Sequence, residues 1–194
     1  MTPQEIDQQI YNVATAAGFI DSAAKYIVAQ ARYESADYSS NVFRSNNNMY
    51  GMKYVAQQLA TRGTLAPLSE RSLSCRTKNI CKNSDHYAKY INASDSAQDV
   101  INRLYQKTMG GVRPAQLKTA TSPEIFADLL KKRGYYGATV EQYARGLRAK
   151  LKKVNIIPAQ TLPGVTIETP KKKFNALIIG GVALLLFFYL RKKR

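Results

Sequence analysis

The sequence predicts a mainly α-helical (α+β) domain with a small irregular or β-rich lobe, followed by a C-terminal transmembrane helix. Three observations lead to this fold class. Apolar residues recur at helical spacing in five stretches of the first 154 residues. Residues 53–92 lack that spacing and contain Gly63, Pro67 and both cysteines, which favours an inserted lobe. Residues 174–190 carry no charged side chain.

The first two helices are predicted from their ends and their apolar stripes. A capping box from Thr2 to Glu5 opens the first helix, and Gly18 closes it. Asp21 is predicted to cap the second helix, which runs to Glu34. The expected inward residues are Ile6, Ile10, Val13 and Ala17 in the first helix, and Ala24, Ile27, Val28 and Ala31 in the second.

Three further helices follow the lobe. The third is predicted over residues 95–108, and the fourth opens at Ser122-Pro123-Glu124 and ends at Gly134. The fifth is marked only by its apolar residues. The expected inward residues are Ala97, Val100, Ile101, Leu104 and Tyr105 in the third, Ile125, Phe126, Leu129 and Leu130 in the fourth, and Tyr143, Leu147, Leu151 and Val154 in the fifth.

The domain organisation follows from the change in composition after residue 154. A Pro-containing basic linker is predicted over residues 155–173, a transmembrane anchor over 174–190 and a basic tail over 191–194. At about 1.5 Å per residue the anchor spans roughly 25 Å, the short end of what crosses a bilayer. A buried core helix is the alternative, but such a helix rarely ends in Arg-Lys-Lys-Arg.

The net charge predicts an anionic partner. Twenty-nine Lys and Arg face thirteen Asp and Glu, giving +16. Nucleic acid, anionic lipid and an acidic cell-wall polymer all fit, and charge does not choose among them. Cys75, Cys81 and His86 lack the ligand number and spacing of a zinc site, so neither a metal nor a cofactor is expected. The sequence leaves open whether the two cysteines form a disulfide or are two free thiols.

Glu34 is the candidate for catalysis. It lies on the apolar side of the second predicted helix, one turn after Gln30. A carboxyl group in an apolar pocket has a raised pKa and can act as a general acid near neutral pH. The alternative is a helix-terminal Glu that points into water.

The surroundings of Glu34 resemble the glucosaminidase family of peptidoglycan hydrolases, which have a lysozyme-like fold. The resemblance rests on "AQARYES" and on "NNMYGMK" thirteen residues after the Glu, and it continues in "YAKYINASDSAQDVINRL" and "LLKKRGYYGATVEQYARGL". It covers roughly residues 1–154, which would form the catalytic domain. The sequence departs from the family in "ADYSS" after Glu-Ser and in having no Trp.

The resemblance implies the roles of individual residues. Glu34 corresponds to the catalytic acid, and Tyr136, or its neighbour Tyr135, to the aromatic residue beside it. Glu70 is the candidate for the second catalytic group and Asp85 the weaker one; the substrate's own N-acetyl group is the alternative to both. The substrate-binding candidates are Gln30, Tyr38, Asn47, Asn48, Tyr50, Gly51 and Tyr135. The Asn-Asn-Met-Tyr-Gly segment fits a structural turn equally well.

The predicted function is hydrolysis of the β-1,4 bonds of peptidoglycan, of the endo-β-N-acetylglucosaminidase type. A lytic transglycosylase on the same fold is one alternative, and a non-catalytic basic, membrane-anchored structural or nucleic-acid-binding protein is another. Peptidoglycan and, through the C-terminal helix, a lipid bilayer are the expected partners, whereas nucleic acid is not. The N-terminus shows no export signal, which favours the virion membrane of a membrane-containing bacteriophage over a tail-anchored bacterial enzyme.

Overall fold

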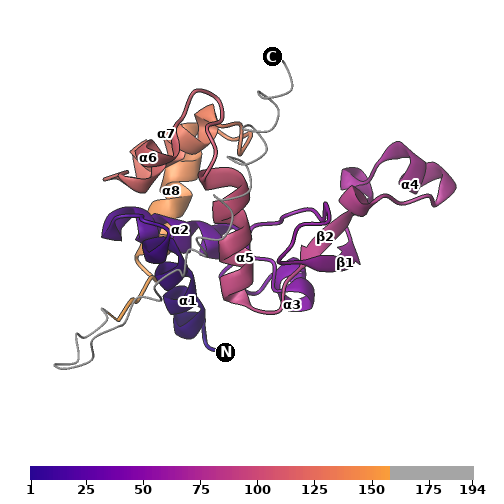
Figure 1. The fold of residues 1–194 in the computed structure, drawn as a ribbon, viewed down its shortest axis with the longest axis horizontal. Helices are drawn as coiled ribbons and strands as arrows, with labels where there is room; N and C mark the ends of the chain where they lie inside the picture. The colour runs from indigo at the N-terminus through magenta and orange to yellow at the C-terminus, as the bar shows by residue number, and fades with distance from the viewer. Residues whose placement is uncertain (158–194) are drawn as a thin grey trace, which may run out of the picture. The chain divides into compact units, whose positions relative to one another are not determined.

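The computed structural model describes residues 1–157, which form a helical body and a projecting lobe (Figure 1). The lobe consists of residues 53–92, and the rest of the described chain is the body. The five predicted helices are all present in the body. They are α1 (Pro3–Ala16), α2 (Asp21–Glu34), α5 (Ala93–Val100), α7 (Pro123–Lys132) and α8 (Val140–Leu151).

Side-chain caps determine where several of these helices begin. Thr2 caps α1 in the predicted capping box, with the Glu5 amide donating to its hydroxyl at 3.2 Å. Ser122 caps α7 as predicted, and Thr139 caps α8. These caps satisfy amide groups that have no partner inside the helix.

The predicted helix ends need three corrections. Asp21 is the first residue of α2 instead of its cap, and its carboxylate accepts from Lys25 at 2.9 Å. The third helix begins at Ala93 because Asn92 caps it. It ends in a π-helical turn, η3 (Ile101–Tyr105), instead of continuing to residue 108.

One residue that was predicted to point inward does not, and three short helices were not predicted. Ile125 is 47% exposed on α7, whereas Val154 packs against the core as predicted, although it follows the end of α8. The additional helices have five or six residues, too few to show a helical period. They are α3 (Asn41–Asn46), α4 (Leu73–Lys78) and α6 (Pro114–Lys118).

Helix α2 occupies the centre of the body. It packs against α1, α6, α7 and α8, and nine of its fourteen residues are buried. Apolar side chains from α1, α5, α7 and α8 complete the same core. The last residue of α2 is Glu34, so the most deeply packed helix of the body carries the predicted catalytic acid at its end.

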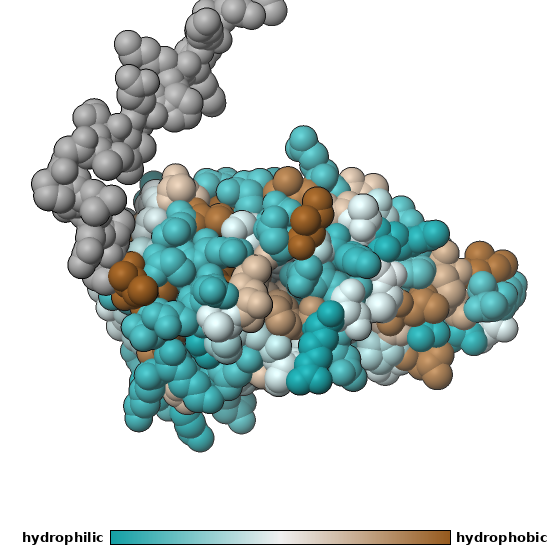
Figure 2. All heavy atoms as spheres, turned by 90° about the horizontal axis from the view of Figure 1, so that it is seen from below, coloured by the Kyte–Doolittle hydropathy of each residue, from teal (hydrophilic) through white to brown (hydrophobic). Residues whose placement is uncertain are grey.

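The predicted β-rich lobe contains a two-stranded antiparallel sheet. Strand β1 (Thr61–Leu65) pairs with β2 (His86–Lys89), with Thr61 opposite Lys89 and Leu65 opposite His86. Two single 3₁₀ turns, η1 (Leu68–Glu70) and η2 (Asn83–Asp85), lie with α4 between the strands. Apolar surface gathers at the lobe end of the molecule (Figure 2), where Leu68, Leu73 and Ile80 are each more than 60% exposed.

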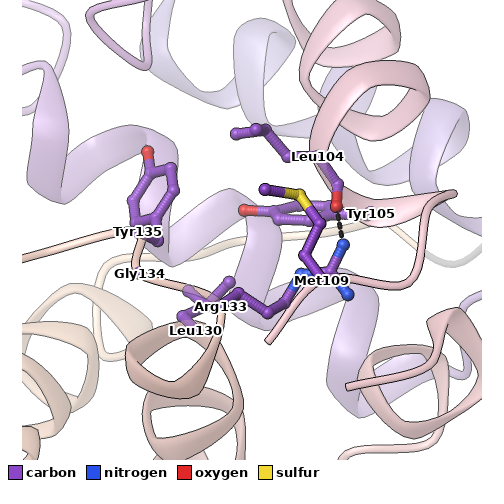
Figure 3. A pocket seen from close by; sticks show the side chains of 7 residues that line it. All are labelled: Leu104, Tyr105, Met109, Leu130, Arg133, Gly134 and Tyr135. Carbon is purple, nitrogen blue, oxygen red and sulfur yellow. Dashed lines mark hydrogen bonds between the residues drawn. The ribbon is translucent and has the colours of Figure 1, made fainter. Parts of the chain in front are cut away.

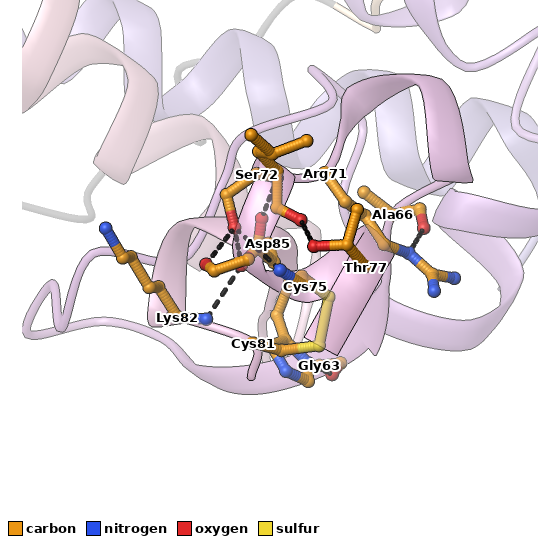
Figure 4. The surroundings of a disulfide bond; sticks show 12 residues. Gly63, Ala66, Arg71, Ser72, Cys75, Thr77, Cys81, Lys82 and Asp85 are labelled. Atoms are coloured by element: carbon orange, nitrogen blue, oxygen red, sulfur yellow. Dashed lines mark hydrogen bonds between the residues drawn. A yellow bond between two sulfur atoms is a disulfide. The ribbon is translucent and has the colours of Figure 1, made fainter. Parts of the chain in front are cut away.

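A disulfide and a buried carboxylate hold the lobe together (Figure 4). Cys75 and Cys81, left open as a disulfide or two thiols by the sequence, are bonded to each other. Asp85 accepts hydrogen bonds from the backbone and hydroxyl of Ser72 and from the backbone of Lys82. Although Cys75, Cys81 and Asp85 cluster together, the disulfide leaves no thiolate there to bind a metal.

The predicted fold class is wrong about the transmembrane helix. In residues 1–157 no helix is both long and apolar enough to cross a membrane. The longest, α1 and α2, have 14 residues, against about 20 for a bilayer span. The segment 174–190, where the anchor was predicted, lies outside the described residues, as do most of the linker and the tail. Residues 1–157 do not test the predicted virion-membrane location, which stays a prediction.

Candidate active site

Glu34 ends α2 where the helix reaches the surface. The residue is exposed as a whole, but protein atoms surround its carboxyl group. Burial of this group raises the pKa of Glu34 above its ordinary value of 4.5, and a hydrogen bond from Tyr143 opposes the shift. A carboxyl group that is partly desolvated yet open on one side can hold a proton and still reach a ligand.

Tyr143 contacts Glu34 directly. Its hydroxyl donates to Oε1 of Glu34 at 2.8 Å, joining α8 to the end of α2. The Tyr143 side chain is buried, and burial, followed by the neighbouring Tyr135 and Glu34, raises the pKa of its hydroxyl. Tyr143 was predicted only as a core residue of its helix, so its contact with the acid was missed.

Two more tyrosines, whose pKa values burial and the charge of Glu34 raise, line a cavity of about 260 Å³ (Figure 3). Glu34 is not among the residues that line this cavity. Tyr105 reaches the cavity from η3, and Tyr135 reaches it from the segment after α7. The pKa of each is raised, chiefly by burial, with the charge of Glu34 contributing. Leu104, Met109, Leu130 and Arg133 make the rest of the wall largely apolar.

Gln30, predicted to bind substrate, is fully buried one turn before Glu34. Its Oε1 accepts a short hydrogen bond from the hydroxyl of Tyr105. Its Nε2 has no hydrogen-bond partner among residues 1–157. Gln30 therefore positions the cavity tyrosine Tyr105 in this structure, and a substrate contact stays a prediction.

Tyr136 packs against Tyr143, the residue that contacts Glu34. Its ring stacks on that of Tyr143 with centroids 3.9 Å apart and planes 7° apart. Its hydroxyl donates to the carbonyl of Ala127 at 2.9 Å. Of the two tyrosines predicted beside the acid, Tyr135 is the one whose pKa the charge of Glu34 affects.

Glu70, the predicted second catalytic group, lies on the lobe. Its Oε2 is 2.6 Å from Nζ of Lys53 and accepts from the Tyr87 hydroxyl at 3.1 Å. The ion pair with Lys53, more than any other contact, lowers the pKa of Glu70. The pKa of Glu70 is thus shifted in the direction opposite to that of Glu34. Asp85 is buried inside the lobe, where it accepts the hydrogen bonds described above. Its carboxylate is therefore not placed to act as the second catalytic group.

The structure buries two tyrosines that were predicted to bind substrate. Tyr38 donates to the buried carboxylate of Asp7 at 2.7 Å and is 7% exposed. Tyr50 is 5% exposed, with its hydroxyl 3.4 Å from the carbonyl of Ile27. Neither ring presents a face to solvent, so the geometry gives their predicted role in binding no support.

The Asn-Asn-Met-Tyr-Gly segment is a structural connection between body and lobe. Asn47 donates to the carbonyls of Tyr90 and Ile91. Asn48, which is buried, donates to those of Met52 and Ala88. Gly51 has a φ of +63°, which glycine adopts without strain. The alternative of a structural turn fits these contacts, and direct sugar binding by the segment stays a prediction.

Comparison with known proteins identifies the fold and the family. The glucosaminidase family profile, described as mannosyl-glycoprotein endo-beta-N-acetylglucosaminidase, matches residues 12–156. The chain belongs to the glucosaminidase family. This membership confirms the predicted family and the predicted enzyme class, a glycoside hydrolase. No curated protein sequence gave a significant match.

Several solved structures share the fold of this glucosaminidase-family chain. A type VI secretion system effector–immunity complex from Pseudomonas protegens gives a TM-score of 0.51 at 14% identity, covering 77% of this chain and 91% of the other. The catalytic domain of the autolysin Auto from Listeria monocytogenes gives 0.50 at 19%, covering 78% and 81%. A peptidoglycan hydrolase from Sphingomonas sp. A1 gives 0.50 at 19%, covering 78% and 94%. These likenesses confirm the predicted lysozyme-like fold of the helical body and small sheet.

Proposed function

We propose that this enzyme cleaves the β-1,4 bond between N-acetylglucosamine and N-acetylmuramic acid units of peptidoglycan, with Glu34 as the general acid. Peptidoglycan hydrolysis is the activity that the family and the fold support. The environment of Glu34 supports its role, because burial raises the pKa of its carboxyl group, and because its charge acts on Tyr105 and Tyr135, which line the cavity.

The chemistry requires that the leaving oxygen receive a proton as an oxocarbenium-like centre develops on the sugar. Glu34 would supply that proton, since its raised pKa keeps more of it protonated near neutral pH. The resulting carboxylate would accept the hydrogen bond that Tyr143 already makes to Oε1.

A second group must stabilise the developing positive charge or activate water. Glu70 suits this role chemically, because its ion pair with Lys53 lowers its pKa and keeps it negative. The two carboxyl groups have pKa values shifted in opposite directions, the pattern expected of an acid and a base that share a reaction. The N-acetyl group of the substrate is the alternative to Glu70.

Two general properties of the chain support a cell-wall substrate. The net charge of +16 suits an acidic wall polymer. The Cys75–Cys81 disulfide suits work outside a reducing compartment, where such bonds persist.

The test is Glu34→Gln on purified peptidoglycan. This substitution keeps an acceptor for Tyr143 but removes the proton, so the rate should fall at least about 100-fold, the scale of a lost general acid. Glu124→Gln is the matched control, because Glu124 is a solvent-exposed partner of Arg148 on the body. A Glu34→Gln enzyme that clears cell walls at the wild-type rate would refute the proposal.

Product analysis separates hydrolysis from the lytic transglycosylase alternative. Mass spectrometry of the wild-type digest should show reducing-end hexosamine. A 1,6-anhydro product would instead assign the chain to the transglycosylases and would leave the role of Glu34 as acid intact.

A further inference from the structure

We propose that Tyr143 is a positioning residue that keeps the catalytic proton of Glu34 on Oε2. This inference rests on the proposed function, in which Glu34 is the general acid. Tyr143 would not touch the reacting atoms itself; it would decide which carboxyl oxygen delivers the proton.

The contact between Tyr143 and Glu34 is specific to one oxygen. The Tyr143 hydroxyl donates to Oε1 at 2.8 Å, and among residues 1–157 it is the one hydrogen-bond donor to this carboxyl group. An oxygen that accepts a hydrogen bond is less basic than one that does not. The acidic proton of Glu34 therefore belongs on Oε2, and Oε1 faces α8.

Tyr143 remains a donor over the working pH range. Burial, followed by the nearby Tyr135 and Glu34, raises the pKa of its hydroxyl, so it does not ionise. When Glu34 gives its Oε2 proton to the glycosidic oxygen, the O–H bond of the acid breaks and that of the leaving group forms. The Tyr143 hydroxyl then donates to the new carboxylate, the form with which its hydrogen bond is stronger.

Two further rings hold Tyr143 in this position. Tyr136 stacks on one face with centroids 3.9 Å apart, and Tyr33 meets the ring edge-on at 5.4 Å. Gly146 lies one turn further along α8, and a Cβ there would be 2.5 Å from the ring of Tyr33. Glycine is unfavourable inside a helix, and here it leaves room for the ring that supports Tyr143.

Burial and the Tyr143 hydrogen bond act in opposite directions on the pKa of Glu34, and this difference provides a test. The hydrogen bond from Tyr143 lowers the pKa of Glu34, against the burial that raises it. Tyr143→Phe keeps the ring and removes this hydrogen bond, so the pKa of Glu34 should rise. The alkaline limb of the kcat/KM profile should therefore move to higher pH, while kcat falls by about 10-fold, the scale of one hydrogen bond to a charged group.

The experiment compares four full-length proteins: wild type, Tyr143→Phe, Tyr26→Phe and Glu34→Gln. Tyr26→Phe is the matched control, since it removes a buried tyrosine hydroxyl of α2 that donates to the carbonyl of Thr121, away from the site. The proposal expects a lower kcat, little change in KM and a raised alkaline limb for Tyr143→Phe alone. If the alkaline limb of Tyr143→Phe stays in place or moves to lower pH, or if only KM changes, the proposal is overturned.

Glu34→Gln keeps this test separate from the proposed function. If Glu34→Gln is inactive and Tyr143→Phe leaves the limb in place, only the role of Tyr143 fails. If Glu34→Gln is active, the proposed function fails first. Should Tyr143→Phe not fold, Gly146→Ala replaces it: displacement of Tyr33 should raise the limb by a smaller amount, and an unmoved limb would again overturn the proposal.

Discussion

The body and the lobe are stabilised in different ways, and the two candidate carboxyl groups differ accordingly. In the body, α2 is surrounded by apolar side chains from four other helices, and burial raises the pKa of Glu34 at its end. The lobe has few buried residues and relies on a two-stranded sheet and one disulfide. Its carboxylate, Glu70, is exposed, and its ion pair with Lys53 lowers its pKa. The difference shows how one small fold can shift the pKa values of two carboxyl groups in opposite directions.

The largest expected effect comes from a buried ion pair in the body. Arg32 donates to both carboxylate oxygens of Asp7, which is fully buried. Arg32→Met leaves that charge without its partner and should lower the free energy of unfolding by about 3 kcal/mol. Chemical denaturation measures the change, with Arg145→Met on the surface of α8 as the control. Equal free energies of unfolding for the two variants would contradict the view that buried contacts stabilise the body.

The second effect should be confined to the lobe. Replacing Cys75 and Cys81 together by Ser removes a short covalent loop, which stabilises by about 2 kcal/mol in the chain-entropy model. Hydrogen exchange should quicken for the amides of α4 and η2, while those of α2 keep their protection. If all amides of the body lost protection equally, the lobe would not be a separately stabilised region.

The smallest effect concerns the acid limb of activity. Because Lys53 lowers the pKa of Glu70, the carboxylate stays ionised to lower pH than usual. Lys53→Met should raise that pKa, so a reaction that needs ionised Glu70 should lose activity at a higher pH as the solution is acidified. The pH dependence of kcat/KM measures this shift, with Lys89→Met, on the exposed side of β2, as the control. An acid limb that stays in place would remove Glu70 from the mechanism.

The sequence predicted the body better than the lobe, for a physical reason. Helical stretches of ten residues or more show their period, so α1, α2, α7 and α8, and α5 together with η3, could be located within a few residues. The short helices α3 and α4 show no period, and neither does a strand of four or five residues such as β2. The lobe could therefore be predicted only as irregular or β-rich.

The candidate site shows the same limit at the level of side chains. Glu34 and Gln30 were found because a polar residue on an apolar stripe is conspicuous. Tyr143 was missed because its ring belongs to the core and only its hydroxyl reaches Glu34. Tyr38, predicted to bind sugar, is buried against Asp7, a contact between residues 31 positions apart that no local pattern reveals.

The most direct test of the account is the titration of Glu34 itself. Carbon-13 NMR of the glutamate side-chain carboxyl groups, with the Glu34 signal assigned by its loss in Glu34→Gln, gives its pKa in the free enzyme. The account predicts a midpoint above the ordinary value of 4.5 that coincides with the alkaline limb of kcat/KM. A midpoint at or below 4.5, or one that does not coincide with that limb, would contradict Glu34 as the general acid.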